Sequence, residues 1–209
     1  MLRSRHGRRA FASVYRIAFG TLVLVAIATE FSAAASRPHF NPANFFSFFT
    51  IVSNTFGALV FLYAVLRPAS LRLDLFRGAA VTALTIVGVV FAIALAGLES
   101  EIIPWVNTVL HDVMPIAAVA DWVIVPPSRR LTFREGLTWL VLPLLYVAYT
   151  LIRGALVHWY PYPFLDANAI GYPALFANCT AIGAFAVVVV LAVIATGNSL
   201  RRRSPLRVS

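Results

Sequence analysis

Two side chains that could act as a nucleophile and a general base lie in apolar stretches of the chain. Thr50 follows an aromatic run in NFFSFFTIVSN, and His111 lies in IIPWVNTVLHDVMPIAAVADWVIVPP, residues 102–127. An imidazole can accept a proton near neutral pH, so it can activate a hydroxyl oxygen for attack on an ester carbonyl. Pro115 comes four residues after His111 and leaves the His111 carbonyl without its usual helical partner, which predicts a kink or a wet pocket. An ionisable group inside such an apolar stretch is costly, which makes His111 a candidate functional residue.

The composition of the chain defines the class of protein that must position these two residues. Of its 209 residues, 60% are hydrophobic and only 12% are charged, too few to cover a soluble domain of this size. We therefore expect an all-α, polytopic membrane protein with a single domain over residues 1–209. Six apolar stretches predict a bundle of six transmembrane helices, over residues 12–34, 44–66, 77–98, 103–125, 136–157 and 170–196.

The basic residues predict how this bundle is oriented. All 17 are arginines, and most fall before the first stretch, in two alternate connectors, or at the C-terminal end. The positive-inside rule then places both termini in the cytoplasm. The residues of this set are Arg3, Arg5, Arg8, Arg9, Arg67, Arg72, Arg77, Arg129, Arg130, Arg134, Arg201, Arg202, Arg203 and Arg207. Their placement favours contact with anionic membrane lipids, and no nucleic-acid partner is expected. The absence of lysine is typical of a GC-rich genome and suggests a bacterial plasma membrane.

The first apolar stretch has some features of a secretory signal. It follows a basic segment and ends near the alanines at 33–35, which resemble a cleavage site. We expect a retained helix instead, because the apolar run is longer than a typical signal core and has interfacial charges, Arg16 and Glu30, near its ends. Cleavage is the alternative.

The predicted topology brings Thr50 and His111 to a similar depth in the membrane. The second and fourth stretches both run inward from the outer face, so the two residues would lie ~10–12 Å below it at 1.5 Å per residue. Other polar residues at this level could bind substrate or an oxyanion; they are Ser53, Asn54, Asn107 and Asn178. A purely structural explanation also exists, since threonine often bonds to a carbonyl one turn back and histidine often joins helices.

Charged residues near this level have two possible roles. Asp112 is adjacent to His111 but points about 100° away on a helix, so it is not expected to complete a triad. We expect it to form an ion pair with Arg153, with Glu30 as a competing partner. Arg153 could instead hold a substrate carboxylate through two parallel hydrogen bonds.

The longest outer connector, residues 158–172, contains two prolines and many aromatic residues. We expect it to form a stiff lid at the membrane surface, with Tyr162 in an outer aromatic belt. His158 would be a rival general base if the loop folded inward, but an exposed histidine at the interface is the expected arrangement.

Two more reactive side chains within the apolar stretches are expected to be structural. Cys179 is the single cysteine of the chain and is expected to be a small apolar filler. Asp121 lies near the inner end of the fourth stretch, far from Thr50. We expect it to pair with Arg16 or with the loop at 129–130.

Three segments resemble a known family. NFFSFFTIVSNTFGALVFL, WVNTVLHDVMP and YPYPFLD are similar to segments of the androgen-induced and androgen-dependent TFPI-regulating proteins, and the similarity runs from about residue 44 to the last apolar stretch. That family consists of membrane threonine hydrolases of fatty acid esters of hydroxy fatty acids. The resemblance implies that Thr50 is the nucleophile, that His111 acts with it, and that this chain is a bacterial member. Asp112 and the spacing from His111 to Pro115 depart from the animal members.

We therefore expect an ester hydrolase that takes lipid esters from the outer leaflet. We expect it to need no metal or organic cofactor, since the sequence has no zinc-type cluster and no phosphate-binding glycine loop; it also has no serine elbow. The acyl tails are expected among four phenylalanines, Phe45, Phe46, Phe48 and Phe49. The alternative is a non-catalytic membrane protein or small-solute carrier, in which His111, Asp112 and Arg153 form a polar path. The polar residues gather in the outer half of the membrane, which favours a pocket over a path.

Overall fold

The fold is built only of helices in the part of the chain that the structure describes. This computed structural model covers residues 2–67, 69–97 and 101–203. Five helical segments are long and apolar enough to cross a membrane: Arg9–Ala35, Phe49–Leu66, Leu71–Leu95, Phe133–Val157 and Ala167–Arg201. The all-α class is confirmed, and the apolar helices indicate a membrane-embedded protein.

The helices follow the predicted stretches but differ from them at their ends. The first half contains α1 (Leu2–Ala35), α2 (Pro42–Phe46), α3 (Phe49–Leu66), α4 (Leu71–Val90) and the π-helical turn η1 (Phe91–Leu95). The second half contains α5 (Pro104–Thr108), the π-helical turn η2 (Val109–Val113), α6 (Met114–Ile124), α7 (Phe133–Leu137), the 3₁₀ turn η3 (Thr138–Leu140), α8 (Val141–Val157), the 3₁₀ turn η4 (Pro163–Leu165) and α9 (Ala167–Arg203). Both stretches that carry the candidate pair are thus interrupted, one between α2 and α3 and the other at η2.

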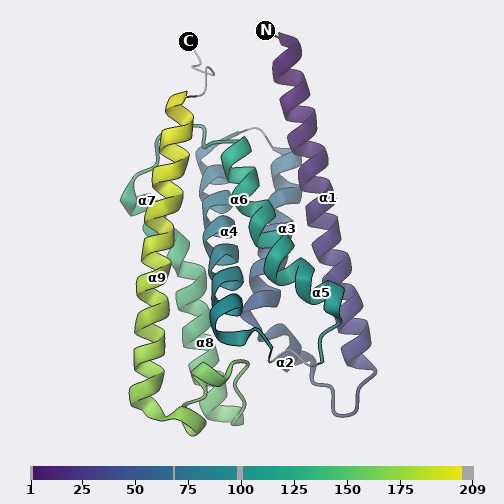
Figure 1. Cartoon of the computed structure of the whole chain (residues 1–209), viewed down its shortest axis with the longest axis vertical. Coiled ribbons are helices and arrows are strands. Elements are labelled where there is room, and N and C mark those ends of the chain that lie inside the picture. Colours follow the sequence, from purple (N-terminus) through teal and green to yellow (C-terminus); the bar gives the residue numbers. More distant parts are fainter. Residues whose placement is uncertain (1, 68, 98–100, 204–209) are drawn as a thin grey trace.

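The helices run side by side, and the start of α1 and the end of α9 lie at the same end of the bundle (Figure 1). Helix α4 is central, since it contacts α3, α6, α8 and α9. Its buried Leu84 packs in one core with Val106 and Met114 of the segment that carries His111. Many large apolar side chains on the outside, such as Ile93 and Leu156, are exposed, as suits a surface that faces lipid.

Local signals explain where several helices begin. Asn41 caps α2 by accepting a hydrogen bond from the Ala43 backbone N–H at 2.9 Å, and Pro42 follows at the first helical position. Ser70 caps α4 in the same way. Thr132 and Glu135 form a reciprocal capping box at α7.

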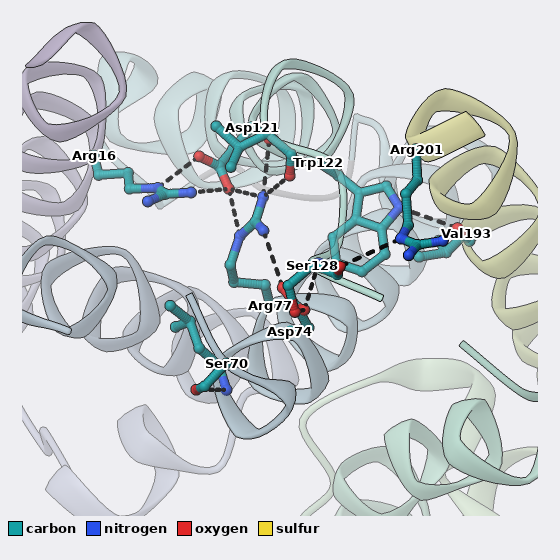
Figure 2. A network of polar contacts seen from close by, with 11 residues as sticks. Arg16, Ser70, Asp74, Arg77, Asp121, Trp122, Ser128, Val193 and Arg201 are labelled. Atoms are coloured by element: carbon teal, nitrogen blue, oxygen red, sulfur yellow. Dashed lines mark hydrogen bonds and ion pairs between the residues drawn. The ribbon is translucent and has the colours of Figure 1, made fainter. Parts of the chain in front are cut away.

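A buried cluster of four charges joins α1, α4 and α6 (Figure 2). The Asp121 carboxylate of α6 accepts hydrogen bonds from Arg16 Nε of α1 at 2.7 Å and from Arg77 Nε of α4 at 2.9 Å. Arg77 also lies 3.6 Å from Asp74, which accepts a hydrogen bond from the Ser128 backbone N–H. Two guanidinium and two carboxylate groups balance in charge, so each buried ion has opposite charges beside it.

This cluster confirms one sequence prediction and corrects another. Asp121 pairs with Arg16 as expected, and it does not use the loop at 129–130. Arg77 was expected in a connector, but it lies within α4 and is only 3% exposed. The cluster therefore fixes α6 against α1 and α4, and with it the turn η2 that precedes α6.

Candidate active site

The helix that carries Thr50 begins inside the protein. The predicted stretch at 44–66 is divided at Ser47, whose carbonyl accepts a hydrogen bond from the Tyr146 hydroxyl at 2.9 Å. The Ser47 hydroxyl donates to the Ala43 carbonyl at 2.6 Å. Because these bonds satisfy groups that a continuous helix would pair, the chain can leave α2 and start α3 at Phe49. Thr50 consequently lies in the first turn of α3.

Thr50 and His111 meet in the interior. The distance between Thr50 Oγ1 and His111 Nε2 is 3.2 Å, and both residues are buried. His111 Nδ1 lies 3.1 Å from the Asn107 carbonyl oxygen. Since a carbonyl oxygen can only accept a hydrogen bond, this contact places a proton on Nδ1. In the neutral imidazole, Nε2 then carries the lone pair that faces the Thr50 hydroxyl. The two residues have the geometry of a nucleophile and its base.

A π-helical turn sets the position of His111. Residues Val109–Val113 form this turn, where a kink was expected from Pro115. The Phe91 ring of η1 stacks on the imidazole, with ring centroids 3.8 Å apart and planes 15° apart. Helix α4 can approach this closely because position 88 is glycine: a Cβ there would lie 3.1 Å from the His111 carbonyl oxygen and 3.2 Å from the Pro115 Cβ.

Tyr162 is a site residue that the sequence did not reveal. Its hydroxyl lies 3.3 Å from Thr50 Oγ1, and the Thr50 backbone N–H donates to the same hydroxyl at 3.3 Å. Tyr162 was expected in an outer aromatic belt, but it is only 8% exposed, because η4 and its flanking loop fold inward and stack Phe164 on the Tyr162 ring. Burial raises the pKa of the Tyr162 phenol, an effect partly opposed by its hydrogen bonds to Thr50, so the hydroxyl keeps its proton near neutral pH.

The amides expected to bind an oxyanion have other partners. The Asn54 side-chain amide donates to the carbonyls of Thr50 at 2.9 Å and Leu110 at 3.0 Å, so it ties α3 to η2. Asn178 donates to the Phe164 carbonyl at 3.0 Å and holds the loop around η4. Both amides thus hold elements together, and their binding of an oxyanion stays a prediction. Asn107 contributes through its backbone carbonyl, which contacts His111 Nδ1 and orients the imidazole.

Ser53 and His158 do not join the pair. Ser53 is fully buried in α3, away from the cavity described below. His158 is exposed and ends α8 in a left-handed conformation with φ 54°, as expected for a residue outside the site.

The expected ion pairs near the outer end are wrong. Arg153 donates to the Asn44 side-chain oxygen at 2.7 Å, and its guanidinium lies over the Trp159 ring. Asp112 is exposed, because it points away from the bundle, and no ion pair between it and Arg153 occurs among the described residues. Glu30 lies 3.3 Å from Arg37. Among the described residues, the Arg153 guanidinium thus contacts an amide oxygen and an aromatic ring rather than a carboxylate.

An apolar cavity of about 360 Å³ opens beside Thr50. Helices α4, α8 and α9 and the loop around η4 form its walls, with Thr50, Tyr146 and Tyr162 as its polar residues. Of the four phenylalanines expected to hold the acyl tails, only Phe49 lines it. Phe45 packs on Phe31 instead, and Phe46 is 55% exposed. Three of the four phenylalanines therefore lie outside the lining of the cavity.

No family model, no curated protein and no solved structure matches this chain. Within the described residues, no group of three or more His, Cys, Asp or Glu side chains is placed to hold a metal ion. The site is thus defined by its own geometry: a buried hydroxyl, an imidazole that faces it, a phenol that contacts it, and an apolar cavity beside it.

Proposed function

We propose that the protein is an intramembrane hydrolase of lipid esters, with Thr50 as nucleophile and His111 as general base. The observation that carries this proposal is the 3.2 Å contact between Thr50 Oγ1 and His111 Nε2. The apolar cavity beside the hydroxyl and the resemblance to membrane threonine hydrolases support the same assignment. A carrier has less support, because the cavity walls are almost entirely apolar and Asp112 does not contact Arg153.

The proposed reaction has two halves. His111 Nε2 takes the proton of the Thr50 hydroxyl while Oγ1 bonds to the ester carbonyl carbon. The carbon–oxygen bond to the alcohol then breaks, and the departing oxygen receives that proton from the imidazolium. In the second half, a water molecule gives a proton to Nε2 and its oxygen attacks the acyl-threonine. The Thr50–acyl bond breaks, the proton returns to Oγ1, and the fatty acid leaves.

Tyr162 is the proposed donor to the oxyanion that forms in each half. If the Thr50 hydroxyl donates to His111, then Tyr162 donates to Thr50 Oγ1, so a protonated phenol already points toward the reacting atoms. The site also lies at the start of α3, where the positive end of the helix dipole favours developing negative charge.

The proposed substrate is an ester whose reacting group enters from the outer leaflet. This requires that the α5–α6 segment cross the membrane as a sixth span, with both termini cytoplasmic in a bacterial plasma membrane, as the arginine distribution favours. A fatty acid ester of a hydroxy fatty acid keeps one free carboxylate, which Arg153 could bind at the outer end of the site. That this chain is a member of the threonine hydrolase family is part of the same proposal.

Ester hydrolysis by purified variants tests the proposal. Thr50→Ala and His111→Ala should each abolish turnover, and the double variant should be no worse than either, because the two residues act as a unit. Thr50→Ser, which keeps the oxygen, should retain part of the activity, whereas Thr50→Val should not. Wild-type activity in both Thr50→Val and His111→Ala, on every ester tried, would refute the hydrolase assignment.

A further inference from the structure

The apolar cavity extends from the nucleophile along α8 and α9. Its wall on α9 extends from Cys179 to Val187, and its wall on α8 and the preceding turn extends from Leu140 to Val147. At 1.5 Å per residue, the α9 wall is ~12 Å long. Because an extended chain of single bonds advances roughly 1.2 Å per bond, this length suits about ten carbon atoms.

The cavity also reaches the lipid-facing surface between α8 and α9. Leu144 of α8 and Gly183 of α9 both line the cavity, and both are exposed. An apolar chain could therefore enter sideways from the bilayer without passing through water. Its lining has no charged group, and the hydroxyls in that lining are those of Thr50, Tyr146 and Tyr162, of which Thr50 and Tyr162 contact each other.

Gly183 keeps this route wide. A Cβ at Gly183 would meet no heavy atom within 4 Å. The contrast with Gly78 is large, since a Cβ there would lie 2.1 Å from the Trp139 ring. Gly78 is needed for close packing, whereas a larger side chain at position 183 can be accommodated and would occupy space in the cavity.

We propose that the α8–α9 cavity binds the single acyl chain that is transferred to Thr50, and that Gly183 sets the length of chain accepted. This inference rests on the proposed function and specifies its substrate: esters of fatty acids with about ten or more carbon atoms, bound with the carbonyl at Thr50 and the methyl end toward mid-membrane. For an ester that enters from water, each methylene buried in the cavity should raise kcat/KM about fourfold, until the cavity is full.

Hydrolysis of 4-nitrophenyl esters from butyrate to palmitate, by protein in digitonin, tests this assignment. Wild-type kcat/KM should rise with chain length and level off near decanoate. Gly183→Leu should keep the butyrate rate within twofold and lose on the order of a hundredfold on decanoate, because three or four methylenes lose their site. Ala184→Leu is the matched control, since Ala184 is exposed and outside the cavity lining, and it should behave as wild type. Equal rates of Gly183→Leu and wild type on all chain lengths would overturn the acyl site while leaving the hydrolase assignment intact.

Cys179 provides a readout that does not need activity. It is the single cysteine of the chain and lines the cavity, so its alkylation by a small apolar maleimide reports occupancy. Decanoic acid should slow this alkylation at least tenfold, and butyric acid should not. Protection by decanoic acid in a protein that hydrolyses no ester would support the acyl site and refute the proposed function. Unchanged alkylation in the presence of saturating decanoic acid would overturn the acyl site.

Discussion

Replacing Tyr162 with phenylalanine removes one hydroxyl from the site and keeps the ring that packs on Phe48 and Phe164. In the proposed reaction this hydroxyl stabilises the oxyanion, and the loss of one such donor costs roughly 10²–10³ in kcat. The variant also leaves the Thr50 backbone N–H without its 3.3 Å acceptor, which should lower the free energy of unfolding by about 1–3 kcal/mol. KM should change little, because the ground-state ester makes no charged contact there.

Steady-state hydrolysis of the decanoyl ester measures the change in kcat and KM. Unfolding of the same samples measures the change in stability. Tyr160→Phe is the matched control: Tyr160 lies in the same loop, but its ring packs against Gly154 rather than Thr50. It should keep wild-type kcat. A Tyr162→Phe enzyme with kcat within twofold of wild type would show that the phenol only fills space, and the oxyanion donor would have to be sought elsewhere.

Three other perturbations follow from the structure. Asp121→Asn removes the carboxylate that Arg16 and Arg77 share, so denaturant unfolding in micelles should show a loss of about 3–5 kcal/mol; unchanged stability would mean that the buried cluster does not hold the helices together. Arg153→Ala should reduce kcat/KM at least about tenfold more for esters with a free carboxylate than for neutral analogues, and equal losses would assign Arg153 to packing alone. In a Cys179→Ala background, Arg130→Cys should resist an impermeant thiol reagent in intact cells; rapid labelling would contradict the cytoplasmic placement of that loop.

The sequence was sufficient to predict the helical class and the meeting of Thr50 with His111. Apolar stretches of helical length define where helices form, and the constant rise of a helix converts residue number into depth. The pairing of Asp121 with Arg16 was predictable for a related reason, since a buried carboxylate requires a cation at its own level.

The rest of the site depends on contacts that no local pattern records. Tyr162 reaches Thr50 because a proline-bounded loop folds inward, and the interruption at Ser47 depends on a hydroxyl from Tyr146, 99 residues away. The Asn54 amide donates to the Leu110 carbonyl, a contact that its depth alone does not indicate. The position of the cavity depends on how all the helices pack together. The sequence therefore could not identify α8 and α9 as the walls of the cavity.

The most direct test of the account is the covalent chemistry of Thr50 itself. Purified protein should react with a fluorophosphonate, with loss of fluoride and formation of a phosphonate ester, and peptide mass analysis should locate the adduct on Thr50. His111→Ala should lose this reaction while remaining folded, and Thr50→Ser should retain it. An adduct on another residue, or undiminished labelling of Thr50→Val, would contradict Thr50 as the nucleophile.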